Sequence, residues 1–264
     1  MTKTIKEVFA EKKKVFIPFI TAGDPDLDTT EKLIYAMEKA GAGIIEIGIP
    51  FSDPIAEGLV IQDADSRALT AGTKIDGIFA MLQKVRRNSQ VPIVFLTYIN
   101  PIYRYGRDKF FKNCQETQVN GVIVPDVPFE ERTIISEYCT KYGVEPISLI
   151  APTSEQRIKL LAKEAKGYIY IVSSLGVTGV RKNISTNIGA IVKQIKEVTD
   201  VPAAVGFGIA TPEQAAAMAK ISDGAIVGSA IVKIVAEFGK NCIQPVAEYT
   251  KKMCEAVTKT IKYN

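Results

Sequence analysis

Apolar runs and amphipathic stretches alternate along the whole chain. The runs are short and rich in β-branched residues, and the stretches between them repeat apolar residues at helical spacing, as Leu33, Met37 and Ala40 do. We expect strands at eight runs, residues 15–20, 44–49, 92–98, 121–126, 146–151, 168–173, 202–207 and 224–227. The pattern therefore predicts strands that alternate with helices.

A repeated strand and helix order is typical of a parallel sheet covered by helices. Eight such units in 264 residues predict an α/β fold, a single (β/α)8 TIM barrel that occupies one domain over residues 1–264. Ile5, Val8 and Phe9 indicate an additional short amphipathic helix at the N-terminus, over residues 1–14. An open doubly wound sheet is the alternative, but it usually carries Gly-x-Gly-x-x-Gly after its first strand, which is not found here.

A glutamate interrupts the second apolar run. Glu46 lies among Ile44, Ile45, Ile47 and Ile49, where an ionised carboxylate is costly unless it is paired or protonated. Burial raises the pKa of a glutamate and lets it exchange protons near neutral pH. Glu46 is therefore a candidate acid and base, and the alternative is a structural glutamate neutralised by a lysine or by backbone hydrogen bonds.

The composition limits the possible chemistry. The chain has no histidine, so an imidazole base, a Ser-His or Cys-His pair and a His-ligated zinc site are excluded. Its net charge of +4 comes from intermixed signs, which argues against nucleic-acid binding. No apolar run reaches the length of a membrane span, and the four cysteines lack metal-ligand spacing, so we expect a cytoplasmic protein with reduced thiols and no metal.

Glycine-bearing turns follow three late strands. They are Gly176 to Gly179, Gly206 to Gly208, and Gly228 with Ser229, which precedes a predicted helix over 230–238. Glycines let backbone N–H groups approach an anion, and a helix N-terminus favours negative charge. The carboxyl end of the late strands is the usual phosphate site of a barrel, so we expect a phosphate here.

The segment after the second strand is enlarged. Residues 50–72 precede the predicted amphipathic helix over 75–87. Because loops after barrel strands build the active site, this segment is a candidate lid or partner surface.

Several motifs together resemble the tryptophan synthase alpha subunit family over nearly the whole chain. They are Pro18-Phe19-Ile20-Thr21-Ala22-Gly23-Asp24-Pro25, Glu46-Ile47-Gly48-Ile49-Pro50-Phe51-Ser52-Asp53-Pro54, Thr97-Tyr98-Ile99-Asn100-Pro101, Pro125-Asp126-Val127-Pro128, Gly176-Val177-Thr178-Gly179, Gly206-Phe207-Gly208-Ile209 and Gly228-Ser229-Ala230-Ile231-Val232-Lys233.

The resemblance implies a lyase of tryptophan biosynthesis that cleaves indole-3-glycerol phosphate by a retro-aldol reaction into indole and glyceraldehyde 3-phosphate. It implies no cofactor in this chain and a pyridoxal-phosphate β subunit as partner in an α2β2 complex, docked on the loops after the second and third strands. It assigns the proton transfers to Glu46 and the stabilisation of the indole nitrogen to Glu57. The implied substrate-binding residues are Phe19, Leu96, Tyr98, Ile123, Tyr170 and Phe207 for indole, Gly179, Gly208, Gly228 and Ser229 for phosphate, and Thr178 in the sixth loop.

The catalytic segment departs from the family at two positions. Where the family has Ala-Asp-Gly-Pro, this chain has Ala56-Glu57-Gly58-Leu59. A displaced catalytic group can lower the rate about a hundredfold. Two hypotheses follow: an active lyase whose loop has shifted to seat the longer Glu57, or a catalytically weakened subunit kept to bind and activate the β subunit.

Overall fold

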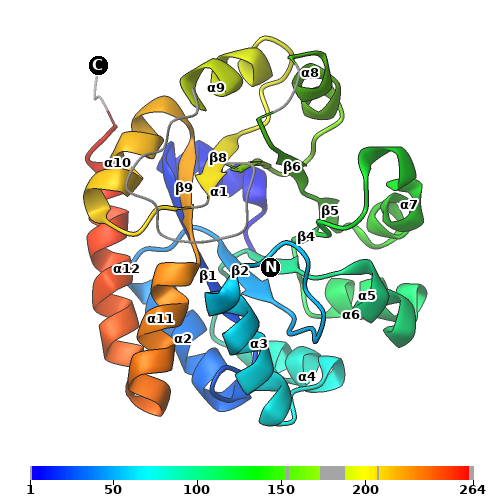
Figure 1. Ribbon diagram of the computed structural model, residues 1–264, viewed down its shortest axis with the longest axis vertical. Coiled ribbons are helices and arrows are strands. Elements are labelled where there is room, and N and C mark those ends of the chain that lie inside the picture. Colours follow the sequence, from blue (N-terminus) through cyan, green and yellow to red (C-terminus); the bar gives the residue numbers. More distant parts are fainter. Residues whose placement is uncertain (1, 153–154, 173–187, 207, 262–264) are drawn as a thin grey trace.

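The fold is described from a computed structural model, which covers residues 2–152, 155–172, 188–206 and 208–261. Parallel strands alternate with helices along this part of the chain, and the helices surround the strands (Figure 1). The strands are β1 (Val15–Thr21), β2 (Ile45–Gly48), β3 (Ile93–Leu96), β4 (Gly121–Ile123), β5 (Glu145–Pro146), β6 (Ser148–Ile150), β7 (Ile169–Val172), β8 (Ala203–Gly206) and β9 (Gly224–Val227).

The strand order shows a nearly closed barrel. The order in the described sheet is β5-β4-β3-β2-β1-β9-β8-β7-β6. The two end strands, β5 and β6, are consecutive in the chain and are separated only by Ile147, whose N–H donates to the Val122 carbonyl at 2.9 Å. They are therefore two segments of one strand, and each of the eight predicted runs contains a strand. The predicted (β/α)8 barrel is confirmed.

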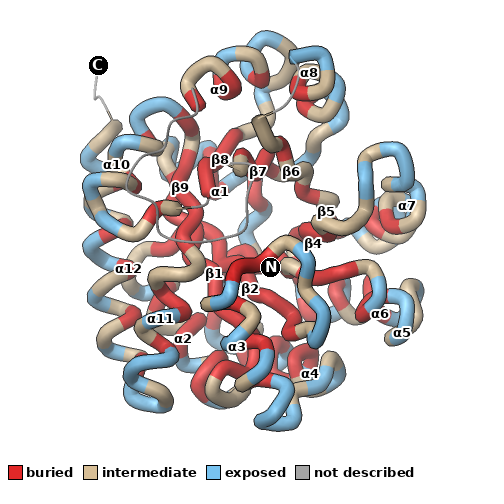
Figure 2. The backbone as a smooth tube through the Cα atoms, viewed as in Figure 1, coloured by how far each residue is buried: buried red, intermediate tan, exposed pale blue. Residues whose placement is uncertain are grey.

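The helices cover the outside of the barrel with their apolar faces. They are α2 (Leu27–Lys39), α3 (Leu59–Thr70), α4 (Ile75–Val85), α5 (Ile99–Tyr105), α6 (Arg107–Glu116), α7 (Thr133–Tyr142), α8 (Glu155–Lys163), α9 (Ile188–Lys196), α10 (Pro212–Ile221), α11 (Ser229–Phe238) and α12 (Ile243–Thr258), with short 3-10 helices η1 (Phe129–Glu131) and η2 (Gly239–Asn241). Figure 2 shows buried backbone at the strands and on the helix sides that face them. Among these described residues, no helix combines the length and apolarity needed to cross a membrane.

The N-terminal helix packs against the inside of the barrel. α1 (Ile5–Lys12) begins at a capping box formed by Thr4 and Glu7. Its buried residues Ile5, Val8 and Phe9 join the cluster that fills the barrel interior, and the ring of Phe9 lies 6.2 Å from that of Tyr168. The helix is shorter than the predicted 1–14, and it ends where Lys13 takes a positive φ of 58°.

The enlarged segment after β2 is half loop and half helix. Residues 49–58 form the loop, and α3 begins at Leu59 with the extended residue Gly58 at its N-cap. Ile61 and Ala64 on α3 pack with Phe19 of β1 and Val232 of α11. This packing holds α3 over one side of the barrel mouth and brings the preceding loop close to the strand ends.

Candidate active site at the carboxyl end of the barrel

Glu46 lies inside the barrel, midway along β2. In the sheet register it pairs with Phe19 on β1 and with Val94 on β3. Ile45 and Ile47 pack in the outer layer between strands and helices, so the alternation of a strand turns Glu46 inward. Only 1% of Glu46 is exposed.

A tyrosine hydroxyl is the hydrogen-bond partner of Glu46. The hydroxyl of Tyr168 donates to Glu46 Oε1. Burial raises the pKa of Glu46 to about 8, and the hydrogen bond from Tyr168 offsets only part of that effect. In the described structure the partner of Glu46 is therefore Tyr168, and not the lysine considered as an alternative. With this pKa, Glu46 is largely protonated at neutral pH.

Two tyrosines at the start of β7 line the same interior. Tyr168 immediately precedes the strand and Tyr170 lies within it, so both side chains point inward. The pKa of the Tyr170 hydroxyl is raised by burial first and then by the charges of Glu46 and Glu57. Tyr170 is therefore close to both candidate carboxyl groups. Sequence reasoning missed Tyr168, although its spacing of two residues from Tyr170 was the available signal.

Glu57 is buried at the mouth of the barrel without a cation to pair with among the described residues. It is 6% exposed, and its Oε2 has no hydrogen-bond partner there. Burial, with a smaller effect of the Asp126 charge, raises the pKa of Glu57 to about 7. Glu57 can therefore change its charge near neutral pH.

Hydrogen bonds to neighbouring elements hold the Glu57 loop in place. The N–H of Ala56 donates to the Tyr98 hydroxyl at 2.9 Å, and Gln62 Nε2 on α3 donates to the Glu57 carbonyl at 2.7 Å. The rings of Phe51 and Tyr98 lie 5.4 Å apart. The loop is thus fixed both to α3 and to the N-terminus of α5.

The described members of the predicted indole pocket come together around these carboxyl groups. Phe19, Ile123, Tyr98 and Tyr170 are buried, and Leu96 is half-buried and packs against both the interior cluster and the Phe19 cluster. Phe207 lies outside the described residues. These side chains are apolar apart from the tyrosine hydroxyls.

Glycines at the strand ends leave room for these aromatic rings. A Cβ on Gly206 would lie 2.3 Å from the Tyr170 hydroxyl oxygen, and one on Gly48 would lie 2.6 Å from Phe19 Cζ. Any larger residue would displace a ring from the pocket. Gly48 and Gly206 are therefore required for the packing of these rings. For Gly206, this requirement adds to the phosphate binding expected of its turn.

The predicted phosphate residues are only partly described. Gly228 is the N-cap of α11 and Ser229 is its first residue, and no side chain caps this helix N-terminus among the described residues. Gly208 follows β8 with a positive φ of 77°. Thr178 and Gly179 lie outside the described residues. The N–H groups at the start of α11 are therefore available to an anion.

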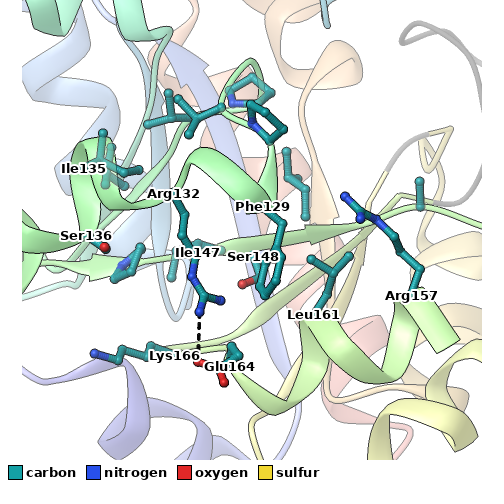
Figure 3. Close-up of a pocket in the computed structure, with 18 of the residues that line it drawn as sticks. Phe129, Arg132, Ile135, Ser136, Ile147, Ser148, Arg157, Leu161, Glu164 and Lys166 are labelled. Atoms are coloured by element: carbon teal, nitrogen blue, oxygen red, sulfur yellow. Dashed lines mark hydrogen bonds and ion pairs between the residues drawn. The ribbon is translucent and has the colours of Figure 1, made fainter.

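A separate cavity of about 470 Å³ lies between α7 and α8, away from Glu46 and Glu57. Figure 3 shows Arg132 reaching across it to Glu164, with Nη2 3.2 Å from Oε2. Arg157, on its other side, forms an ion pair with Glu130 at 2.5 Å. Because these arginines already have carboxylate partners, we place the candidate chemistry at the barrel mouth.

Comparisons with known proteins agree on one family. The family model described as tryptophan synthase alpha chain matches residues 5–262. The tryptophan synthase alpha chain of Lacticaseibacillus casei is 48% identical over 253 residues, which are 96% of this chain and 95% of the relative. That of Alkaliphilus metalliredigens is 42% identical over 258 residues, 97% of each chain.

Solved structures agree with the sequence relatives. Tryptophan synthase subunit alpha from Legionella pneumophila superposes with a TM-score of 0.85 at 35% identity, covering 97% of both chains. A structure of the tryptophan synthase a2b2 complex from Pyrococcus furiosus matches with a TM-score of 0.81 at 34% identity, covering 90% of this chain and 97% of the other.

Proposed function

The chain belongs to the tryptophan synthase alpha chain family, and from that premise we propose that its barrel mouth cleaves indole-3-glycerol phosphate into indole and glyceraldehyde 3-phosphate. The chain is a lyase of tryptophan biosynthesis. The relatives do not favour the alternative of a weakened subunit kept only to activate a partner.

The observation that carries the proposal is that the carboxyl group of Glu46 is buried among apolar side chains, with the Tyr168 hydroxyl as its hydrogen-bond partner. With a pKa of about 8, Glu46 holds a proton at neutral pH. It gives this proton to indole C3, and the indole nitrogen becomes positively charged. The carboxylate of Glu57 stabilises that charge, since a desolvated opposite charge acts strongly over short distances.

The second half of the reaction restores Glu46. As a carboxylate it takes the proton from the glycerol hydroxyl on the carbon attached to indole C3. The bond between that carbon and C3 breaks, its electron pair returns to the indole ring, and the hydroxyl becomes the aldehyde of glyceraldehyde 3-phosphate. One proton leaves Glu46 and one returns, so no cofactor is required in this chain.

In this proposal, the phosphate group of the substrate binds at the start of α11, at the opposite end of the site from Glu46. The start of α11, with Gly228 and Ser229, offers backbone N–H groups and a favourable helix dipole, and Gly208 lets the neighbouring backbone approach. The family resemblance adds Gly179 to the phosphate site, and it implies that Thr178 holds the closed sixth loop against the second one. The apolar wall of Phe19, Leu96, Tyr98, Ile123, Tyr170 and Phe207 takes the indole ring.

The chain works with a β subunit. A related structure is that of an a2b2 complex, and we propose the same assembly here, with pyridoxal phosphate on the β chain. The four cysteines form no disulfide, which supports a cytoplasmic location.

Replacing Glu46 tests the reaction. Glu46→Gln keeps the size of the side chain and an acceptor for Tyr168 but cannot exchange the proton, so kcat for indole release should fall at least about a hundredfold. Binding of a glycerol phosphate analogue should survive. The exposed Glu237→Gln on α11 is the control. Near-normal turnover of Glu46→Gln would mean that Glu46 has only a structural role, and it would contradict the proposal.

A further inference from the structure

Asp24, in the loop that follows β1, forms a two-point ion pair with Arg67 on α3. Arg67 Nε donates to Asp24 Oδ1 and Arg67 Nη2 donates to Asp24 Oδ2, each at 2.8 Å. Only 2% of the Asp24 side chain is exposed, whereas 38% of the Arg67 side chain is. Two parallel hydrogen bonds from the planar guanidinium fix both the distance and the orientation of the partner. The pair therefore joins the loop after β1 to α3 in one defined geometry.

The loop that carries Asp24 is itself held in place. The Gly23 N–H donates to Thr30 Oγ1 at 2.9 Å, and this hydroxyl donates to the Asp26 carbonyl at 2.9 Å. A Cβ on Gly23 would lie 1.9 Å from Oγ1 of Thr73, which follows α3 closely in the chain, so the two segments are in close contact. Asp24 is therefore a fixed point against which α3 can be set.

The apolar contacts of α3 fix its position less sharply than this ion pair does. The buried face of the helix includes Ala64 and Ala68. Beside them, Ile61 packs with Phe19 of β1. Apolar contacts are non-directional, so they hold α3 against the barrel but define its position along the helix axis only weakly. A buried ion pair adds little net stability, because desolvation offsets the attraction, and its main effect here is therefore on position.

The helix carries this constraint to the catalytic loop. About 12 Å of helix separates Arg67 from Leu59, where α3 begins. Glu57 lies just before this start, and Gln62 Nε2 on α3 donates to the Glu57 carbonyl at 2.7 Å. A tilt of about 5° at Arg67 moves the start of the helix by about 1 Å over that length. A displacement of about 1 Å in a catalytic group can lower the rate about a hundredfold.

We propose that Asp24 and Arg67 are positioning residues for Glu57: their ion pair fixes α3 against the loop after β1, and α3 in turn holds the Glu57 carboxyl group at the barrel mouth. This inference rests on the proposed function, in which Glu57 faces the indole nitrogen. The pair acts on the reaction only through the place of Glu57. It therefore affects the step in which the indole nitrogen becomes charged, and it affects substrate binding much less.

Arg67→Lys tests the proposal, because lysine keeps the positive charge but cannot form the two parallel hydrogen bonds. In indole release from indole-3-glycerol phosphate, kcat should fall at least about tenfold while KM changes less than about twofold, since the lost interaction belongs to the transition state. Lys240→Gln is the matched control: it breaks a 2.8 Å ion pair with Asp26, close to the same loop, that does not involve α3. The control should keep the wild-type kcat. A wild-type kcat in Arg67→Lys would overturn the proposal.

A double-mutant cycle shows whether the pair acts through Glu57. Glu57→Gln keeps the size of the side chain but removes its charge. Adding Arg67→Lys to Glu57→Gln should change kcat by less than about twofold, because the charge to be positioned is already absent. An equal fall of kcat in the two backgrounds would mean that the pair supports the fold in general, and it would contradict the positioning role.

Asp24→Asn breaks the pair from the other side if Arg67→Lys does not fold. This variant removes the buried charge and leaves the partly exposed Arg67 to be solvated, so it is the milder change. The same fall in kcat and the same dependence on Glu57 are expected of it. A wild-type kcat in this variant would also overturn the proposal.

Amide hydrogen exchange separates this inference from the proposed function. The Ala56 N–H donates to the Tyr98 hydroxyl at 2.9 Å, and a displaced loop weakens this bond. Exchange at Ala56 should therefore become at least about tenfold faster in Arg67→Lys and stay unchanged in Lys240→Gln. Unchanged exchange in Arg67→Lys would rule out the positioning role whatever the enzyme does, whereas indole release by wild type and by Glu46→Gln judges the proposed function alone.

Discussion

At the scale of single residues, the central fact is that the partner of the buried Glu46 is a hydroxyl group, and that no cation accompanies it among the residues that the structure describes. A lysine would have stabilised the carboxylate and fixed its charge. The Tyr168 hydroxyl can donate to either form of the glutamate through its acceptor oxygens, and so it orients Glu46 without preventing protonation. The apolar interior then favours the protonated form of Glu46, which is the form that the proposed reaction requires.

Glu46 should therefore cost stability as the pH rises. Its pKa is about 8 in the folded protein and near 4.5 when unfolded, so the folded state binds the extra proton between these values. Because protonation and folding are linked, the contribution of Glu46 to stability is fully present below its pKa in the unfolded chain. This contribution is lost as the pH rises through its pKa in the folded protein. Glu46→Gln lacks this loss, and its stability relative to wild type should increase by at least about 1.4 kcal/mol from pH 5 to pH 8.

Urea unfolding at the two pH values measures this difference. Glu57 and Asp65 have raised pKa values as well, but they are present in both proteins and add the same slope. If the two proteins lost stability in parallel from pH 5 to pH 8, Glu46 would not hold its proton in the folded state. The expected variant is more stable at pH 8 and nearly inactive, a trade-off common at active sites.

At the scale of elements, the important unit is the β2–α3 loop and the start of α3. Gly58 supplies an extended N-cap without a side-chain cap, and Leu59 occupies the first helical position with 75% of its surface exposed. The loop keeps its shape through the hydrogen bonds to Tyr98 and from Gln62 and through the contact between the Phe51 and Tyr98 rings. These contacts compensate for the absent proline that stiffens the loop in the family.

Restoring that proline should stabilise the chain. The first helical position tolerates proline because its N–H has no helical partner, and the extended Gly58, with ψ of 170°, fits the residue before a proline. Leu59→Pro should raise the free energy of unfolding by about 0.5–1 kcal/mol, since it restricts the unfolded chain. Chemical denaturation measures the change, with Leu59→Ala as control. A destabilised Leu59→Pro would mean that the start of α3 differs from this description.

At the scale of the whole molecule, the chain leaves apolar side chains exposed at the barrel end that carries the candidate site. Ile55, in the loop after β2, is 72% exposed, and Leu59 lies close to it in the chain. Tyr103 on α5, which follows β3, is also exposed. Exposed apolar residues near one end of a molecule are typical of an interface, and the family resemblance implies that the β subunit docks on these two segments.

Ile55→Asp should weaken binding to the β subunit at least tenfold, about 1.4 kcal/mol, because it places a charge in an apolar contact. Calorimetric titration with a pyridoxal-phosphate-loaded β subunit measures the affinity. Leu160→Asp, which changes an exposed leucine on α8, is the matched control and should bind normally. Equal affinities for the two variants would place the interface elsewhere.

The sequence by itself determined the order of elements and much of the candidate site. Strand and helix periods depend on local alternation, so the eight runs could be located without tertiary contacts. Glu46 was visible because a charge in an apolar strand is a local anomaly. Glycine-bearing turns after the late strands predicted where a phosphate would bind. Motif resemblance assigned the role of Glu57, since the family has a carboxylate at this place in the chain.

Only the tertiary structure decided what surrounds those residues. Tyr168 lies 122 positions from Glu46 in the chain, and Asp65 looks like any polar residue on a helix until α3 is packed against the barrel. The pKa of a carboxyl group depends on the solvent it loses and the charges it meets, and both follow from packing. The sequence therefore identified Glu46 and Glu57, and the fold alone decided which side chains surround them and how far the pKa of each is raised.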